Sequence, residues 1–210
     1  MYVPTAFEEK RVDVMHQLMR ENSLATLVVQ TADGLEANHI PLHLKQDGTK
    51  FGTLVGHIAR TNPVWKMFKS DVEVLAIFNG PNAYISPSWY PTKQENHKAV
   101  PTWNYAAVHA SGFMHVIEDA NWLLELLDIL TREHEAKLEK PWNIADAPED
   151  YVKKLVNAIV GIEIPISKLV GKWKVSQNQP ERNQIGVIEG LTETHDLSEM
   201  ANLMNSHLNK

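Results

Sequence analysis

Leu24-Ala25-Thr26-Leu27-Val28-Val29-Gln30-Thr31 is a run rich in β-branched residues, and the turn sequence Ala32-Asp33-Gly34 follows it at once. Asp-Gly between two strand-like runs is typical of a tight hairpin. A second hairpin is expected directly afterwards: residues 35–46 alternate loosely, Asp47-Gly48 turns the chain, and residues 49–56 return. The sequence therefore predicts three consecutive antiparallel strands.

Further strands are expected where β-branched and aromatic residues cluster between Gly, Pro and Asn. These segments are residues 72–78, 83–86, 100–117, 160–166 and 168–176. The turn sequence Asn79-Gly80-Pro81-Asn82 is expected to separate the first two of them. Residues 88–99 are polar and contain Pro91, so they are expected to form a long loop.

Helices are expected at the connections and the ends, where apolar residues recur at helical spacing. They cover residues 8–22, 63–69, 119–138 (with Asp119 as the N-cap), 148–158 and, in two pieces, 181–208. The order of elements lacks βαβ alternation, and no Gly-x-Gly-x-x-Gly sequence occurs. We therefore expect mainly antiparallel β structure with α additions, a small barrel. A single domain should span residues 1–210, with a helical C-terminal extension from about residue 180.

Composition narrows the classes of protein. The 210 residues correspond to about 1.4 average domains. The net charge of −6 argues against broad electrostatic adhesion to nucleic acid. Cysteine is absent, which removes disulfides and thiol nucleophiles. No apolar run reaches the length of a membrane helix and the N-terminus lacks a signal pattern, so we expect a cytoplasmic protein.

The ten histidines suggest a metal site, but their spacing opposes it. On a strand, His39 and His43 would lie about 13 Å apart, and His109 and His115 about 20 Å apart. Two ligands of one ion must lie much closer. We expect no metal.

The segment Gly56-His57-Ile58-Ala59-Arg60-Thr61-Asn62-Pro63 joins a strand end to a helix start. The unpaired N–H groups of a helix N-terminus and the guanidinium of Arg60 together favour an anion. The alternative is an ordinary helix cap beside a solvated arginine.

Two further segments combine aromatic and polar residues. Residues 84–93 and 100–105 carry five aromatic rings between hydroxyl and amide groups, a composition that suits a planar ligand, a subunit interface or plain packing. In Lys172-Trp173-Lys174 both lysines face the same side of a strand. That side is either a solvated face or part of a polyanion site.

At these segments the chain resembles the PaiB family, described as FMN-binding negative transcriptional regulators with the split β-barrel of pyridoxamine-phosphate oxidases. The resemblance covers nearly the whole chain. The matching words are Met1-Tyr2-Val3-Pro4 with Phe7, Gly56 to Pro63, Tyr84-Ile85-Ser86-Pro87-Ser88-Trp89-Tyr90, Val100-Pro101-Thr102-Trp103-Asn104-Tyr105 with His109, and Lys172-Trp173-Lys174-Val175-Ser176-Gln177-Asn178.

The resemblance implies an FMN site at the interface of a homodimer. One subunit would supply Asn38, His39 and Ile40 along the isoalloxazine, Thr53, His57, Ile58, Ala59 and Arg60 near the ribityl phosphate, and Asn62 at the helix start. The partner subunit would supply Trp103, Asn104, Lys172, Lys174 and Gln177. Oxidases of this fold carry an Arg/Lys-rich phosphate motif after the third strand, whereas this chain has Arg60 alone there, so Lys172 and Lys174 are expected to share the phosphate charge.

Three functions follow from the resemblance. The first is an FMN-binding transcriptional regulator, for which DNA binding rests on the family alone because the chain is acidic and shows no helix-turn-helix pattern. The alternative is a flavin-dependent oxidoreductase or flavin reductase, with Trp89 and Tyr90 as a lid over the flavin. The third is haem binding, since relatives of this fold handle haem and histidine is plentiful.

Overall fold

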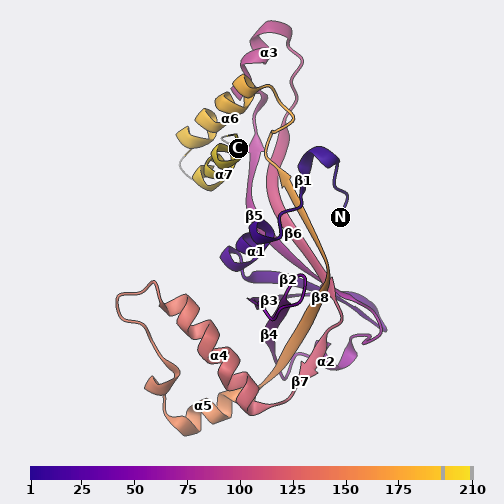
Figure 1. Ribbon diagram of the computed structural model, residues 1–210, viewed down its shortest axis with the longest axis vertical. Coiled ribbons are helices and arrows are strands. Elements are labelled where there is room, and N and C mark those ends of the chain that lie inside the picture. Colours follow the sequence, from indigo (N-terminus) through magenta and orange to yellow (C-terminus); the bar gives the residue numbers. More distant parts are fainter. Residues whose placement is uncertain (195–196, 209–210) are drawn as a thin grey trace. The chain divides into compact units, whose positions relative to one another are not determined.

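The computed structural model describes residues 1–194 and 197–208 (Figure 1). The strands are β1 (Glu8–Glu9), β2 (Leu24–Thr31), β3 (Gly34–Lys45), β4 (Thr53–Ala59), β5 (Val74–Ile85), β6 (Thr102–Gly112), β7 (His115–Ile117) and β8 (Ile159–Lys174). The α-helices are α1 (Val12–Glu21), α2 (Val64–Met67), α3 (Pro91–Asn96), α4 (Ala120–Glu135), α5 (Glu149–Val156), α6 (Glu181–Glu193) and α7 (Ser198–Leu208). Short 3-10 turns are η1 (Thr5–Phe7), η2 (Pro87–Trp89) and η3 (Ile144–Asp146).

The strands pair in the antiparallel sense, as the sequence predicts. β2 pairs with β3 and β5, β4 with β3 and β8, and β8 also with β1 and β7. β6 completes the sheet through β5 and β8. In the first hairpin Thr31 lies opposite Gly34, so the turn falls on the expected residues. The prediction of mainly antiparallel β structure with α additions is confirmed.

The second hairpin has a longer loop than predicted, because β4 begins at Thr53 and not at residue 49. The carboxylate of Asp47 accepts hydrogen bonds from the hydroxyl of Thr53 at 2.6 Å and from the amide and hydroxyl of Thr49 at 3.0 and 2.7 Å. These bonds, that from Thr53 foremost, lower the pKa of Asp47 to about 2. The aspartate thus organises the loop as well as the turn.

The turn predicted at residues 79–82 is wrong, because β5 runs through it without interruption. Gly80 and Pro81 lie inside this strand. A Cβ atom on Gly80 would lie 2.8 Å from Cδ1 of Leu18, closer than packed side chains approach. The glycine is therefore required by the close packing of α1 and not by a turn.

Three other boundaries differ from the predictions. The helix expected at residues 8–22 begins at Val12, since Glu8 and Glu9 pair with β8 as strand β1. The loop expected at residues 88–99 contains η2 and α3, both started by a proline at the first helical positions. Strand β8 is continuous through Pro165, where two strands were predicted. The predicted Asp119 cap is confirmed by its bonds to the amides of Asn121 and Trp122 at 2.8 and 3.0 Å.

The described chain forms two compact units that interleave along the sequence. Unit 1 comprises residues 1–21, 79–109 and those from 170 onward, and unit 2 comprises residues 22–78 and 110–169. Strands β5, β6 and β8 contribute residues to both units. Fully buried side chains fill unit 1 at Met19, Ile85, Leu191, Met200 and Met204, and unit 2 at Leu27, Leu42, Leu54, Phe78, Leu123, Ile162 and Ile164. No helix within the described part of the chain has the length and apolar character that a membrane span needs.

In unit 1, helix α6 packs closely against η2 and α3, and α7 lies beside α6 (Figure 1). A Cβ atom on Gly186 would lie 2.3 Å from the carbonyl oxygen of Trp89, and one on Gly190 would lie 2.5 Å from the Trp89 ring. Two glycines one helical turn apart thus allow α6 to approach the backbone of η2. Trp89 is thus packed against α6, and the lid that the sequence suggested for Trp89 and Tyr90 stays a prediction.

We predict that Gly186→Ala destabilises the protein by about 1–3 kcal/mol, because the added methyl group meets a backbone carbonyl that cannot rotate away. Helix propensity alone predicts the opposite sign, since Ala is favoured over Gly by about 1 kcal/mol inside a helix. Urea unfolding measures the difference. Glu189→Ala, at an exposed position of the same helix, is the control and should change stability little. A stabilised Gly186→Ala protein would contradict the packing described here.

Candidate functional site

The structure divides the residues predicted for the site between the two units. Unit 2 contains the predicted residues of β3, β4 and the start of α2, which are Asn38, His39, Ile40, Thr53, His57, Ile58, Ala59, Arg60 and Asn62. Unit 1 contains those of β6, the end of β8 and the turn after it, which are Trp103, Asn104, Lys172, Lys174 and Gln177.

In unit 2, Asn62 ties the start of α2 to strand β3. Its amide donates to Oδ1 of Asn38 at 2.7 Å, and its own Oδ1 accepts from the backbone N–H of Val64 at 3.0 Å. Helix α2 has four residues, and its first N–H group is already satisfied by this cap. Asn62 thus accepts from the first N–H group of α2 from the position before Pro63, and its predicted contact with a flavin stays a prediction.

Arg60 is held by the chain itself. Its guanidinium donates to the carboxylate of Glu118 at 2.6 Å and to the carbonyl oxygens of Asn157 and Ile159 at 3.0 and 3.1 Å. It also lies over the ring of Trp65. These bonds use three of the five N–H donors of the guanidinium, and the predicted role of Arg60 toward a phosphate stays a prediction.

Most of the other predicted residues of unit 2 serve the sheet. Thr53 is buried and bonded to Asp47, and Ile40 and Ile58 lie in the core. His39 is exposed on β3, with Nδ1 3.2 Å from the hydroxyl of Thr26 on β2. Ala59 is exposed at the end of β4. Only His39 and Ala59 of this set present atoms freely to solvent.

His57 is the exception in β4. Its side chain is half-buried, and its Nδ1 is a buried atom without a hydrogen-bond partner among the described residues. Burial lowers the pKa of His57 below its ordinary value. A neutral imidazole with an unused ring nitrogen can accept a hydrogen bond from, or donate one to, a ligand.

In unit 1, the two predicted lysines of β8 sit among aromatic rings and backbone carbonyls of the N-terminus and β6. The ammonium of Lys172 donates to the carbonyl of Tyr2 at 3.2 Å and lies over the rings of Tyr2 and Tyr105. The ammonium of Lys174 donates to the hydroxyl of Thr102 at 2.6 Å and to the carbonyl of Trp103. Desolvation, and then the charge of Lys172, lower the pKa of Lys174.

Trp103 and Gln177 have different surroundings. Trp103 is 56% exposed and meets the Tyr84 ring edge-on, with the ring centroids 6.0 Å apart. An exposed aromatic pair of this kind can take a planar ligand or a second chain. Gln177 instead closes the turn after β8, accepting from the amide of Val175 and donating to the carbonyl of Trp173. Its side chain is engaged in holding Ser176 in place.

Asn104 is almost completely buried, at 1% exposure. Its amide nitrogen donates to the hydroxyl of Ser176 at 2.8 Å and lies 3.5 Å from the sulfur of Met204. Ser176 is in turn hydrogen-bonded to the buried Tyr90. The amide oxygen Oδ1 of Asn104 has no hydrogen-bond partner among the described residues.

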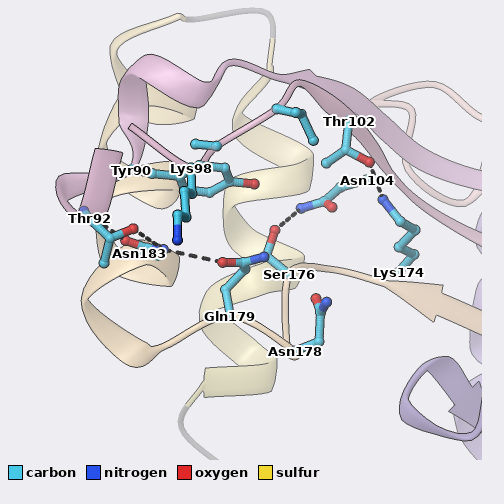
Figure 2. Close-up of a pocket in the computed structure, with 12 residues that line it drawn as sticks. Tyr90, Thr92, Lys98, Thr102, Asn104, Lys174, Ser176, Asn178, Gln179 and Asn183 are labelled. Atoms are coloured by element: carbon cyan, nitrogen blue, oxygen red, sulfur yellow. Dashed lines mark hydrogen bonds between the residues drawn. The ribbon is translucent and has the colours of Figure 1, made fainter. Parts of the chain in front are cut away.

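Asn104, Ser176 and Tyr90 line a pocket of about 250 Å³ in unit 1 (Figure 2). The other residues of its lining come from α3, the segment before β6, and the start of α6. The side-chain nitrogen of Asn183 on α6 donates to the hydroxyl of Thr92 on α3 at 2.9 Å, which joins these two helices. The complete lining is Tyr90, Thr92, Lys98, Ala99, Val100, Thr102, Asn104, Lys174, Ser176, Asn178, Gln179 and Asn183. Of these residues, Asn104 and Lys174 were predicted from the sequence for the flavin site and Tyr90 for a lid, and the matching words also contain Val100, Thr102, Ser176 and Asn178.

Metal binding finds no matching cluster in the described structure. Within residues 1–194 and 197–208, no three His, Asp or Glu side chains gather in a way that could hold a metal ion. His43 is paired with Glu133 at 2.9 Å.

The sequence of the chain is similar to that of known proteins over its whole length. Residues 1–168 match the family described as "Putative FMN-binding domain". The whole chain is 34% identical over 212 residues to the Bacillus subtilis "Protease synthase and sporulation protein PAI 2", covering 100% of this chain and 99% of that one. The chain belongs to the PaiB family.

Two solved structures share the PaiB-family fold seen here. The FAD- and haem-binding protein from Mycobacterium smegmatis has a TM-score of 0.58 and 14% identity, covering 80% of this chain and 73% of that one. The flavocytochrome Anf3 from Azotobacter vinelandii has a TM-score of 0.55 and 11% identity, covering 80% and 69%. At these identities the likeness concerns the fold alone, and it confirms the predicted split barrel.

The two buried polar atoms without partners test whether the residues of this PaiB-family chain fit a flavin. Nδ1 of His57 and Oδ1 of Asn104 both need a hydrogen-bonding ligand or water, because a buried polar group left unpaired costs about 1–3 kcal/mol. A flavin mononucleotide presents ring N–H, carbonyl, hydroxyl and phosphate groups. Each of the two atoms can pair with polar groups of this kind.

We predict that acid weakens the fold through His57. Because the pKa of this side chain is lowered in the folded state, protons bind better to the unfolded chain. Its contribution to stability is complete above the unfolded pKa of about 6.5 and is lost as the pH falls through the folded pKa. The free energy of unfolding, measured in urea between pH 8 and 5, should fall less steeply in His57→Gln than in the parent protein. His134→Gln, at an exposed position of α4, is the control, and an unchanged slope in His57→Gln would contradict the assignment.

Proposed function

We propose that this protein is a homodimeric, FMN-binding regulator of the PaiB type, in which each flavin lies between unit 2 of one subunit and unit 1 of its partner. One observation carries the proposal. The residues that resemble the family's flavin site fall into two groups in different units of one chain, and each group holds a buried polar atom without a partner. Two half-sites of this kind are what a site completed by a second subunit requires.

The unit 2 half-site would hold the isoalloxazine. His57 offers an unused ring nitrogen, and His39 is exposed on β3. Asn38 on β3 and Asn62 before α2 are joined by a hydrogen bond between their side-chain amides. Ile40, Ile58, Ala59 and Thr53 would shape the floor of this half-site, and Arg60 would stand at its edge.

The unit 1 half-site would close over the flavin from the partner subunit. Trp103 and Tyr84 present an exposed aromatic pair, which suits the flat face of a flavin or the contact between subunits. Lys172 and Lys174 place positive charge nearby on β8. Gln177 would act indirectly, by fixing the turn that carries Ser176.

Regulation, in this proposal, depends on the flavin and on a protein partner. The net charge of −6 opposes broad attraction to DNA, so direct DNA binding rests on the family alone. A bound flavin would supply redox chemistry that can report the state of the cell. The oxidoreductase alternative keeps Trp89 and Tyr90 as its candidate lid, and Trp89 would then act from a position packed against α6.

The test is a titration with FMN, followed by flavin fluorescence, together with the mass in solution. We expect binding near one flavin per subunit and a particle of twice the 23.8 kDa chain. Absence of binding at micromolar flavin, or a monomeric complex, would overturn the proposal. Addition of a reduced nicotinamide then separates the functions, since rapid bleaching of the bound flavin would favour the oxidoreductase.

A mixed dimer tests whether the site is shared between subunits. We predict that His57→Leu and Trp103→Ala each weaken FMN binding about tenfold or more in their homodimers, because every site then carries one change. A heterodimer with one change in each chain should regain one intact site and bind half the flavin. Trp142→Ala, another exposed tryptophan, is the control. A heterodimer that binds no better than either homodimer would place the whole site within one chain.

A further inference from the structure

The pocket of unit 1 ends in a chain of buried hydrogen bonds. The amide nitrogen of Asn104 donates to Ser176 (Figure 2). Ser176 is also hydrogen-bonded to Tyr90. The Met204 sulfur can accept a hydrogen bond but has none to donate, so its contact with the nitrogen of Asn104 orients the amide and leaves Oδ1 as an acceptor. A ligand that satisfies this oxygen must bring a hydrogen-bond donor.

The remaining lining is cationic and rich in donors. Lys98 and Lys174 line the pocket, and no carboxylate is among its lining residues. Lys174 uses two of its three N–H donors on Thr102 and Trp103, which leaves one for a ligand. Hydroxyl and amide side chains supply most of the other surface. The lining as a whole favours an anion.

These two requirements together select the ligand. We propose that the unit 1 pocket binds a phosphate group that retains a proton, either orthophosphate or the terminal phosphate of a phosphomonoester, with its P–OH donated to Oδ1 of Asn104 and its anionic oxygens facing Lys174. Sulfate has a similar shape and charge but carries no proton near neutral pH, so it leaves Asn104 unsatisfied. The pocket should therefore distinguish two anions that a simple cationic surface treats alike.

The size of the pocket agrees with a small group. At about 250 Å³ it lies below the 300–1,000 Å³ that is usual for sites enclosing a whole drug-sized ligand. It can enclose a phosphate while the rest of an ester lies outside. The lowered pKa of Lys174 agrees with a desolvated ammonium that gains from an anion.

The pocket also offers a solution to the phosphate of FMN. Arg60, which the family resemblance implies for that role, is bonded to Glu118, Asn157 and Ile159. A phosphate held at Lys174 would need no rearrangement of Arg60. The inference itself does not depend on flavin binding, since orthophosphate alone tests it.

The experiment is calorimetric titration of the full chain with orthophosphate and, separately, with sulfate at equal ionic strength and pH 7. We expect orthophosphate to bind at least about tenfold more tightly than sulfate, and Lys174→Gln to weaken it about tenfold or more. Asn104→Leu should abolish the preference for phosphate. If that buried substitution prevents folding, the preference of the parent protein and the effect of Lys174→Gln still decide.

Two further variants serve as controls for Lys174→Gln. Lys168→Gln removes an exposed lysine of the same strand, and Arg60→Gln removes the other candidate for the phosphate. Both should leave orthophosphate binding unchanged. Equal binding of sulfate and phosphate, no binding of either, or a loss in Arg60→Gln as large as in Lys174→Gln would overturn the proposal.

Competition identifies the source of the phosphate. If the pocket holds the phosphate of FMN, orthophosphate should weaken FMN binding and leave riboflavin binding unchanged. If it holds free phosphate, FMN and orthophosphate should bind independently. Failure of all flavin binding with retained orthophosphate binding would reject the proposed function while supporting this pocket.

Discussion

Strand β8 contributes buried side chains to the cores of both units. Neighbouring side chains of a strand point to opposite faces, and the face that is buried changes along β8. From Val160 to Ile166 the buried apolar residues occupy even-numbered positions, whereas Trp173 and the following Val175 bury odd-numbered ones. Residues 160–166 belong to unit 2 and residues 173–175 to unit 1. Because the buried positions change from even to odd, Lys172 and Lys174 lie on the face opposite to Trp173 and Val175. On that face the two ammonium groups donate hydrogen bonds to the carbonyl of Tyr2 and the hydroxyl of Thr102. The orientation of Lys172 and Lys174 thus follows from the division of β8 between the two units.

The elements that depend on local chemistry were predictable from sequence. The Asp-Gly hairpin, the Asp119 cap and the two C-terminal helices all follow from residues close together in the chain. The turn expected at residues 79–82 was not, because the same Gly-Pro signal arises when a distant side chain, here Leu18, needs the space of a Cβ atom. Local sequence cannot distinguish these two causes.

The candidate site shows the same division. The family resemblance found the segments, but not which side chains remain available in them. Arg60 is bonded to residues 58 to 99 positions away, and Asn104 reaches Ser176 and Met204 across 72 and 100 positions. Such partners decide whether a polar group is occupied or available, and they follow from tertiary structure alone. The orphaned oxygen of Asn104 was therefore beyond any motif, although its residue was named.

Ser176 has a backbone φ of 62°, in the left-handed region that glycine adopts more easily. Glycine there would relieve the strain but would lose the hydroxyl that links Asn104 to Tyr90. The chain thus carries a strained backbone at a buried serine, and Gln177 locks it from the following position. Folding therefore already removes the conformational freedom of Ser176 and Gln177, before a ligand binds. The pocket should consequently be preorganised for its ligand. Its residues should superimpose in the free and bound structures, and binding should cost little conformational entropy there.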